Sequence, residues 1–153
     1  GADDAEAALQ RIKAWEVEHL GYYYDTTAEE IAQMVRGVYG LKAEVMSNPN
    51  VQQIKDALGN NKLVIVPAAG RELGNPYFTA PGPIYHNLVI RGYTEDGTFI
   101  TNDPGTKRGK AYVYSQSVVM DAMHDWVPKQ PRTTPGNGSA TGGKVMIVVS
   151  QAG

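Results

Sequence analysis

The first third of the chain has apolar residues spaced as in amphipathic helices. A first helix is predicted over Asp4–Leu20, where apolar side chains recur every three or four positions behind an aspartate cap. A second begins at the capping-box pattern Thr27-Ala28-Glu29-Glu30 and ends at Gly40. A third is predicted from Asn48-Pro49 to Gly59.

From residue 63 onward the pattern changes to strands. Leu63–Val66 is a continuous apolar run, as in a central strand covered on both faces. Further strands are predicted over residues 43–46, 84–93, 98–103, 110–114 and 144–149. Ser117 is expected to cap a short helix that ends near Trp126. Helices first and an antiparallel sheet afterwards predict an α+β fold.

Composition narrows the classes of function. The 153 residues suit one domain, 1–153, with residues 128–143, rich in Pro, Gly, Thr and Ser, as a mobile loop. A net charge of −2 gives no electrostatic case for nucleic acid as a partner. No apolar run is long enough for a membrane span. The chain has no cysteine, which excludes disulfides and thiolate metal sites within it.

His86 and Asp103 are the candidate catalytic residues, on two strands joined by the turn Thr94–Gly97. If Tyr93 pairs with Thr98, Leu88 faces Asp103, and the two candidates become diagonal neighbours roughly 7 Å apart on one face. An imidazole oriented by a carboxylate is two-thirds of a nucleophilic triad.

Each candidate also has a structural interpretation. His86 on an apolar strand is compatible with a core histidine, and Asp103 with an ordinary turn aspartate. His19 and His124 are expected to be structural. No two histidines have zinc-site spacing, so neither a metal nor another cofactor is expected.

The loop from Gly70 to Phe78 lies between the central strand and the His86 strand, so it is expected to overhang the site. It lacks the Lys-Ser/Thr pair of a phosphate loop, which argues against nucleotide binding. The residues expected to bind substrate are aromatic: Tyr77, Phe78 and Tyr85.

The order of these motifs resembles the papain-like cysteine peptidases of family thirty-nine, which cut double-glycine leaders from bacteriocins. The resemblance covers roughly residues 26–126 and rests on His86, Gly92-Tyr93, Asp96-Gly97 and Asn102-Asp103-Pro104. It implies a papain-like fold and a Cys-His-Asp triad in which His86 activates the thiol and Asp103 orients the imidazole.

No position matches the family's cysteine or its oxyanion glutamine. Either that segment was removed, which we favour, or the domain is naturally degenerate. The chain itself is then expected to be inactive, and the alternatives are a non-catalytic peptide-binding module or an interaction domain with a purely structural pair. The expected partners are a peptide or protein substrate and, beside His86, a missing N-terminal segment or a second copy of the chain. The resemblance favours a bacterial protein outside the cell or in its envelope.

Overall fold

A computed structural model describes residues 26–102, 110–130 and 137–151. The predicted first helix, Asp4–Leu20, lies outside these ranges. The described elements, in chain order, are α2 (Ala28–Tyr39), β1 (Lys42–Ser47), α3 (Val51–Gly59), β2 (Leu63–Ala69), the short 3-10 helix η1 (Gly70–Leu73), β3 (Tyr85–Thr94), β4 (Thr98–Asn102), β5 (Lys110–Ser115), α4 (Gln116–Ala122), β6 (Val127–Pro128), β7 (Gly138–Ser139) and β8 (Val145–Ser150).

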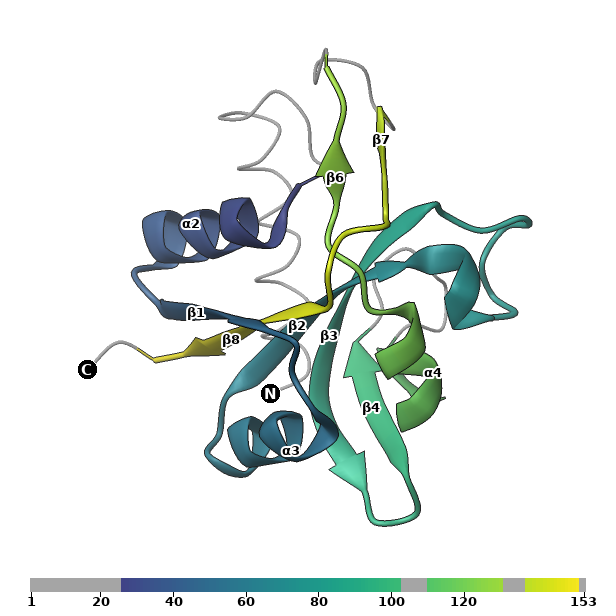
Figure 1. Ribbon diagram of the computed structural model, residues 1–153. Coiled ribbons are helices and arrows are strands. Elements are labelled where there is room, and N and C mark those ends of the chain that lie inside the picture. Colours follow the sequence, from purple (N-terminus) through teal and green to yellow (C-terminus); the bar gives the residue numbers. More distant parts are fainter. Residues whose placement is uncertain (1–25, 103–109, 131–136, 152–153) are drawn as a thin grey trace.

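A six-stranded sheet with the order β1-β8-β2-β3-β4-β5 forms the centre of the molecule (Figure 1). Every neighbouring pair in it is antiparallel, which confirms the predicted α+β class. The late strand β8 is inserted between β1 and β2, so the apolar run at β2 has a strand on both sides. The prediction that this run is central is therefore confirmed.

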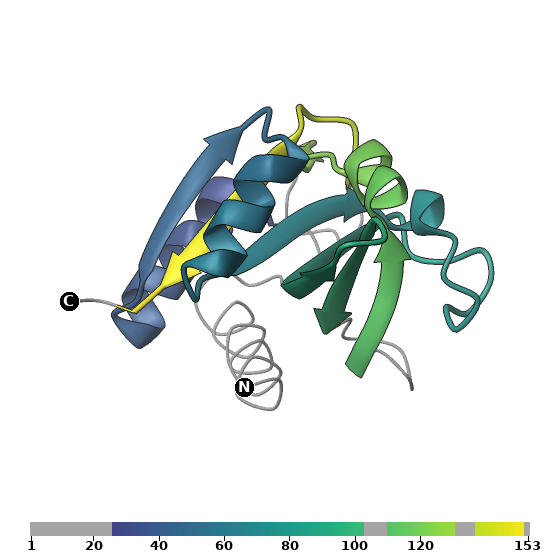
Figure 2. The same ribbon diagram turned by 90° about the horizontal axis from the view of Figure 1, so that it is seen from below.

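Helices cover both faces of the sheet (Figure 2). Alternate residues of β2 divide between two cores, because successive side chains of a strand point to opposite faces. Val64 and Val66 pack in one core with residues of α3 and α4. Ile65 packs in the other with Ile31 and Val35 of α2. This alternation continues into β3, where it decides which side chains flank the candidate site.

The helix boundaries agree with the sequence prediction at α2 and differ at α3 and α4. Thr27 and Glu30 form the predicted reciprocal capping box, and Gly40 ends α2 in a left-handed conformation. The cap of α3 is Asn50, two residues beyond the predicted cap Asn48, and it forms a capping box with Gln53. The cap of α4 is Ser115 in place of Ser117, because its Oγ accepts the Val118 amide at 3.2 Å.

The hairpin of β3 and β4 differs from the prediction at its turn. Thr94 pairs with Thr98 across three residues, where a four-residue loop between Tyr93 and Thr98 was predicted. Gly97 adopts φ +94, and a glycine with positive φ is typical of such short loops. A bulge between Ile90 and Gly92 then shifts the register by one residue. Beyond it the pairing is the predicted one, since Val89 faces Asn102.

The segment predicted as a mobile loop, 128–143, is partly regular. Pro128 pairs with Gly138 in the two-stranded ribbon of β6 and β7, and the Lys129 amide donates to the Asn137 carbonyl at 3.0 Å. Residues 131–136 lie outside the described ranges. The base of this segment is therefore a short ribbon, and the predicted mobility of the segment stays a prediction.

Candidate functional site

His86 lies near the start of β3, directly opposite Ala68 of β2. It shares a face with Leu88 and Ile90, both of which are fully buried in the core with α3 and α4. His86 itself is half-buried, because the sheet core ends at its position. The histidine therefore stands at the border between a packed core and the loop that precedes β3.

Gly70 and Phe78 bring the loop 70–83 close to His86. The ring of Phe78 meets the imidazole edge-on, with centroids 5.1 Å apart. The Gly70 amide donates to the Ile84 carbonyl at 3.1 Å, extending the pairing of β2 with β3 by one step. A Cβ at position 70 would lie 2.4 Å from the Pro83 carbonyl oxygen and 3.2 Å from the His86 Cβ. Only glycine fits there without displacing the backbone around His86.

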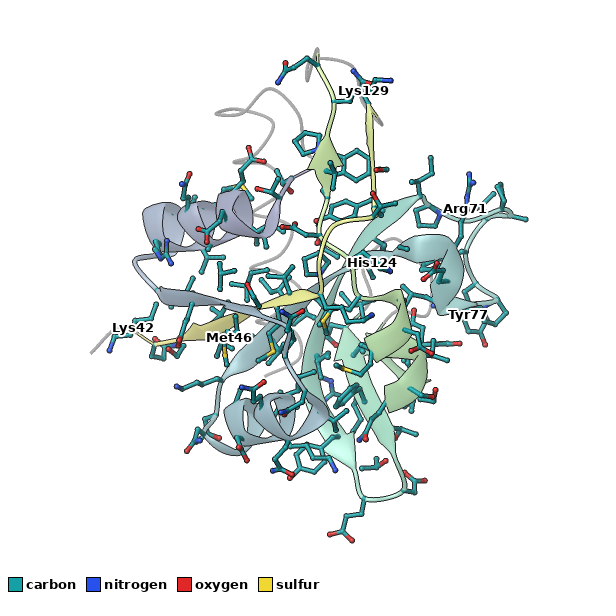
Figure 3. All side chains as sticks on the ribbon, in the orientation of Figure 1. Lys42, Met46, Arg71, Tyr77, His124 and Lys129 are labelled. Atoms are coloured by element: carbon teal, nitrogen blue, oxygen red, sulfur yellow. The ribbon has the colours of Figure 1, made fainter. Side chains whose placement is uncertain are left out.

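The outer part of this loop is tied to the edge strand β5. The Asn75 side-chain amide donates to the Tyr114 hydroxyl at 2.9 Å, and the Asn75 Oδ1 accepts the Tyr77 amide at 2.8 Å. Tyr77 contacts Tyr112 edge-on at 5.9 Å. Figure 3 shows Arg71 on the upper side and Tyr77 on the lower side of the projecting loop. The loop is thus fixed at both its inner and outer ends.

A cavity of about 330 Å³ lies within the loop itself. Its wall includes Arg71, Pro76, Phe78 and Pro81. His86 does not line it, but Phe78 belongs both to its wall and to the surroundings of the imidazole. The cavity therefore lies next to His86, with Phe78 between them, and the imidazole does not face into it.

Asp103, the second predicted catalytic residue, lies outside the described ranges. The preceding residue, Asn102, is buried at the end of β4 and faces Val89. Val89 belongs to the α2 core, so Asn102 lies on the face opposite His86.

The three predicted substrate-binding residues fall in two places. Tyr77 is 44% exposed on the loop, and Phe78 packs against His86. Tyr85 is buried on the other face of β3, where its hydroxyl donates to the Thr26 carbonyl at 2.6 Å and its ring packs against Trp126. The structure brings Tyr77 and Phe78 to the loop beside His86, and it does not bring Tyr85 there.

Asp125 joins the segment after α4 to the start of α2. Its Oδ1 accepts the Ala28 amide and the Trp126 amide, each at 2.9 Å. Burial raises the pKa of the Asp125 carboxyl above its ordinary value, and these two hydrogen bonds partly oppose the shift. Next to it, the Nδ1 of His124 lies 2.9 Å from the Gly142 carbonyl oxygen. These contacts agree with the structural role expected of His124.

The described ranges, 26–102, 110–130 and 137–151, contain neither a metal-binding cluster nor a membrane-spanning helix. There, no three His, Cys, Asp or Glu side chains are grouped closely enough to hold a metal ion. No helix of the same residues combines the length and the apolar character needed to cross a bilayer.

Comparison with solved structures defines the class of fold. A Bacillus anthracis protein whose crystal structure is described as that of a C39-like peptidase matches with a TM-score of 0.55 and 12% identity. The match covers 86% of this chain and 62% of the other, so the present chain spans less than two-thirds of that protein. At this identity the likeness establishes the fold alone.

The model of the Peptidase_C39 like family matches residues 8–128, and the chain belongs to this family. The predicted resemblance to family thirty-nine is thereby confirmed. No curated protein matches the sequence.

Sequence reasoning missed the residues that hold the site in place. Asn75 precedes a proline, and an Asn-Pro pair is typical of an Asx-turn, in which the asparagine side chain accepts the amide two residues on. The bond from the Tyr77 amide to Asn75 could therefore be predicted from the sequence. The bond of Asn75 to Tyr114, 39 positions away, had no local signal. The opposite orientations of Tyr85 and His86 follow from strand alternation alone.

Proposed function

We propose that this chain carries the histidine part of a thiol peptidase site. In this proposal His86 is the general base, Asp103 orients its imidazole, and the nucleophile is a cysteine on a segment outside the 153 residues. The imidazole takes the thiol proton, the thiolate attacks the peptide carbonyl carbon, and the imidazolium then protonates the departing amine. Water hydrolyses the acyl-enzyme in the second half of the reaction.

The observation that carries the proposal is the position of His86, in a chain whose family is established. It lies half-buried where the sheet core ends, so a second segment has access to its ring. Phe78 restricts the ring from one side. A base that is packed on one side and only half-buried suits proton transfer better than a fully enclosed core histidine.

The register of the hairpin supports Asp103 as the orienting residue. The last described pair, Val89 with Asn102, is the one predicted from the sequence. A regular continuation by one residue would set Asp103 opposite Leu88, diagonal to His86 and on the same face.

The tautomer of His86 tests the pairing with Asp103 without requiring activity. An Asp103 carboxylate that accepts from Nδ1 holds the imidazole as the Nδ1–H form, which long-range 15N–1H correlation spectra report. His124 is an internal reference for this tautomer, because its Nδ1 faces a carbonyl oxygen, which only accepts. Asp103→Asn should shift the tautomer of His86, and Asp121→Asn, an exposed aspartate on α4, should not. An unchanged His86 tautomer in Asp103→Asn would contradict the pair.

Activity provides the second test. The 153-residue chain should cleave no peptide, because it has no thiol. The chain expressed with any coding sequence that precedes it should become sensitive to thiol alkylation and cleave peptides, and His86→Ala should lower its kcat by at least about 10²-fold. His86-dependent cleavage by the 153-residue chain alone would refute the proposal.

The absence of cysteine, together with exposed apolar side chains near the start of β3, favours one second candidate. Tyr77 and Ile84 are 44% and 48% exposed. A non-catalytic peptide-binding module would use such groups without any nucleophile. Saturable peptide binding by the extended protein, with no cleavage and no thiol requirement, would favour this candidate over the peptidase.

A further inference from the structure

We infer that the cavity in the loop 70–82 is a recognition site for an acidic residue of a peptide, flanked by an apolar side chain. The inference deepens the proposed function, since it names the kind of peptide recognised beside His86. It rests on the proposed function only in treating the bound peptide as a substrate. Binding itself does not require His86 to be catalytic.

The shape of the cavity is maintained by the loop's own hydrogen bonds. The Gly82 amide donates to the Thr79 carbonyl at 2.7 Å, and the Phe78 amide donates to the Asn75 carbonyl at 3.2 Å. The Arg71 Nε donates to the Gly82 carbonyl at 3.2 Å and links the two ends of the loop. A volume of about 330 Å³ is at the lower end of the range for ligand pockets, of a size suited to one or two amino-acid side chains. A preformed pocket binds with little cost in loop ordering.

The lining combines an apolar wall with one cation. Pro76, Phe78, Ala80 and Pro81 supply carbon surface, and Arg71 is the charged residue among the lining residues. Its neighbour in sequence, Glu72, does not line the cavity. The lining itself therefore carries a positive charge with no acidic residue to neutralise it.

The bonding of Arg71 selects the chemistry of the ligand. Its Nε donates to the Gly82 carbonyl, which fixes the guanidinium beside the cavity. The terminal Nη groups can then donate an end-on pair of hydrogen bonds to a ligand. Carboxylates match that geometry. A peptide supplies a carboxylate from Asp or Glu, or from its C-terminus, and an apolar neighbour in the peptide would contact the prolines and Phe78.

Phe78 couples this pocket to the histidine. It belongs to the cavity wall, and its ring contacts the imidazole edge-on with an interplanar angle of 66°. A peptide anchored at Arg71 is thereby placed next to His86. The pocket would select which peptides reach the site.

The test is an NMR titration of the 15N-labelled chain with three short peptides. The first has the sequence Leu-Glu-Leu with both ends blocked, the second replaces Glu by Gln, and the third is the Gln peptide with a free C-terminal carboxylate. The Glu peptide should perturb the amides of Gly74, Phe78 and Gly82 and bind about fivefold more tightly than the blocked Gln peptide, the ratio for a solvent-exposed charged pair of about 1 kcal/mol. Tighter binding of the third peptide than of the Glu peptide would overturn the assignment to an acidic side chain and identify a C-terminal carboxylate as the ligand.

Variants locate the effect. Arg71→Gln should remove the preference for Glu over Gln, and Arg71→Lys should restore part of it. Arg91→Gln is the matched control, because Arg91 is an exposed arginine on β3 outside the cavity lining. His86→Ala should keep the preference, so loss of catalysis and loss of recognition are distinguishable. Equal affinity for both blocked peptides, no binding, or a preference that survives Arg71→Gln would overturn the inference.

Discussion

The side chains of Tyr85 and His86, consecutive residues of β3, lie in different environments. Tyr85 is 8% exposed, bonded to the Thr26 carbonyl and packed against Trp126. His86 is half-buried, contacts Phe78 and adjoins a loop that encloses a cavity. The difference arises from strand alternation, because one backbone presents successive side chains to two separate layers.

One strand end thus carries the anchoring side chain Tyr85 and, in our proposal, the catalytic side chain His86. On the Tyr85 face, hydrogen bonds from distant parts of the chain converge at α2, as in the bond from the Ala28 amide to Asp125. On the His86 face, the described contacts include the ring of Phe78, which comes from the loop that immediately precedes β3. Stability and function should therefore respond to different substitutions.

The largest expected effect on stability comes from removing the Tyr85 side chain on the anchoring face. Tyr85→Ala should lower the free energy of unfolding by about 3 kcal/mol, because it empties a buried aromatic site and removes the bond to Thr26. His86→Ala should cost about 1 kcal/mol or less, since the side chain is only half-buried. Urea unfolding of both variants measures the difference. Equal losses would show that the two faces are not energetically separate.

The second largest expected effect on stability comes from replacing Asp125, which also anchors the start of α2. Asp125→Ala should cost about 2 kcal/mol, because the Ala28 and Trp126 amides lose their acceptor. Asp125→Asn keeps the Oδ1 acceptor and removes the half-buried charge, so it should cost far less. Thermal or urea unfolding at neutral pH compares the two variants.

The pH dependence of Asp125 has a defined sign. Burial raises the pKa of this carboxyl above 3.8, so the ionised form is disfavoured more in the folded state than in the unfolded one. Its contribution to stability is therefore fully present below the unfolded pKa and is lost as pH rises through the folded pKa. Between neutral pH and about 4, the wild type should gain stability relative to Asp125→Asn as pH falls. A gap that widens in favour of Asp125→Asn at low pH would contradict this.

The smallest expected effect concerns the loop on the His86 face. Tyr114→Phe removes the acceptor of the Asn75 amide and should lower global stability by about 1 kcal/mol. Hydrogen exchange in residues 74–78 should accelerate, while the amides of β2 keep their protection. Tyr93→Phe is the control, because Tyr93 is 40% exposed and away from the loop. Equal exchange in both variants would show that Tyr114 does not hold the loop.

The elements that the sequence predicted well are those set by local patterns. The α2 capping box needs only Thr27 and Glu30, and β2 is identified by its uninterrupted apolar run. At α3 and α4 the sequence offers two capping residues close together, and the prediction took the wrong one in each case. Asn48 adopts a left-handed φ of 51, so the helix begins only after Asn50.

The candidate site was predictable only in part. The motif context singles out His86, whose catalytic role stays a prediction, and strand alternation separates it from Tyr85. The turn between β3 and β4 is one residue shorter than predicted, and the bulge between Ile90 and Gly92 brings the strands back to the predicted register. A hydrophobic pattern reveals neither the shorter turn nor the bulge. Contacts such as that between Ala28 and Asp125 join residues 97 positions apart, and no local pattern reports them.

The position of β8 has a consequence for how the protein is synthesised. Lys42 pairs with Ser150, so β1 leaves the ribosome long before the strand with which it pairs. Until β8 emerges, β1 and β2 are exposed, each with an unpaired edge where β8 will lie, and such edges invite pairing with other chains. Folding should therefore finish late and slowly for a chain of this size, because these contacts are distant in sequence. Chains terminated before β8 should aggregate, and chaperones that bind extended apolar segments should act on the nascent chain before β8 emerges.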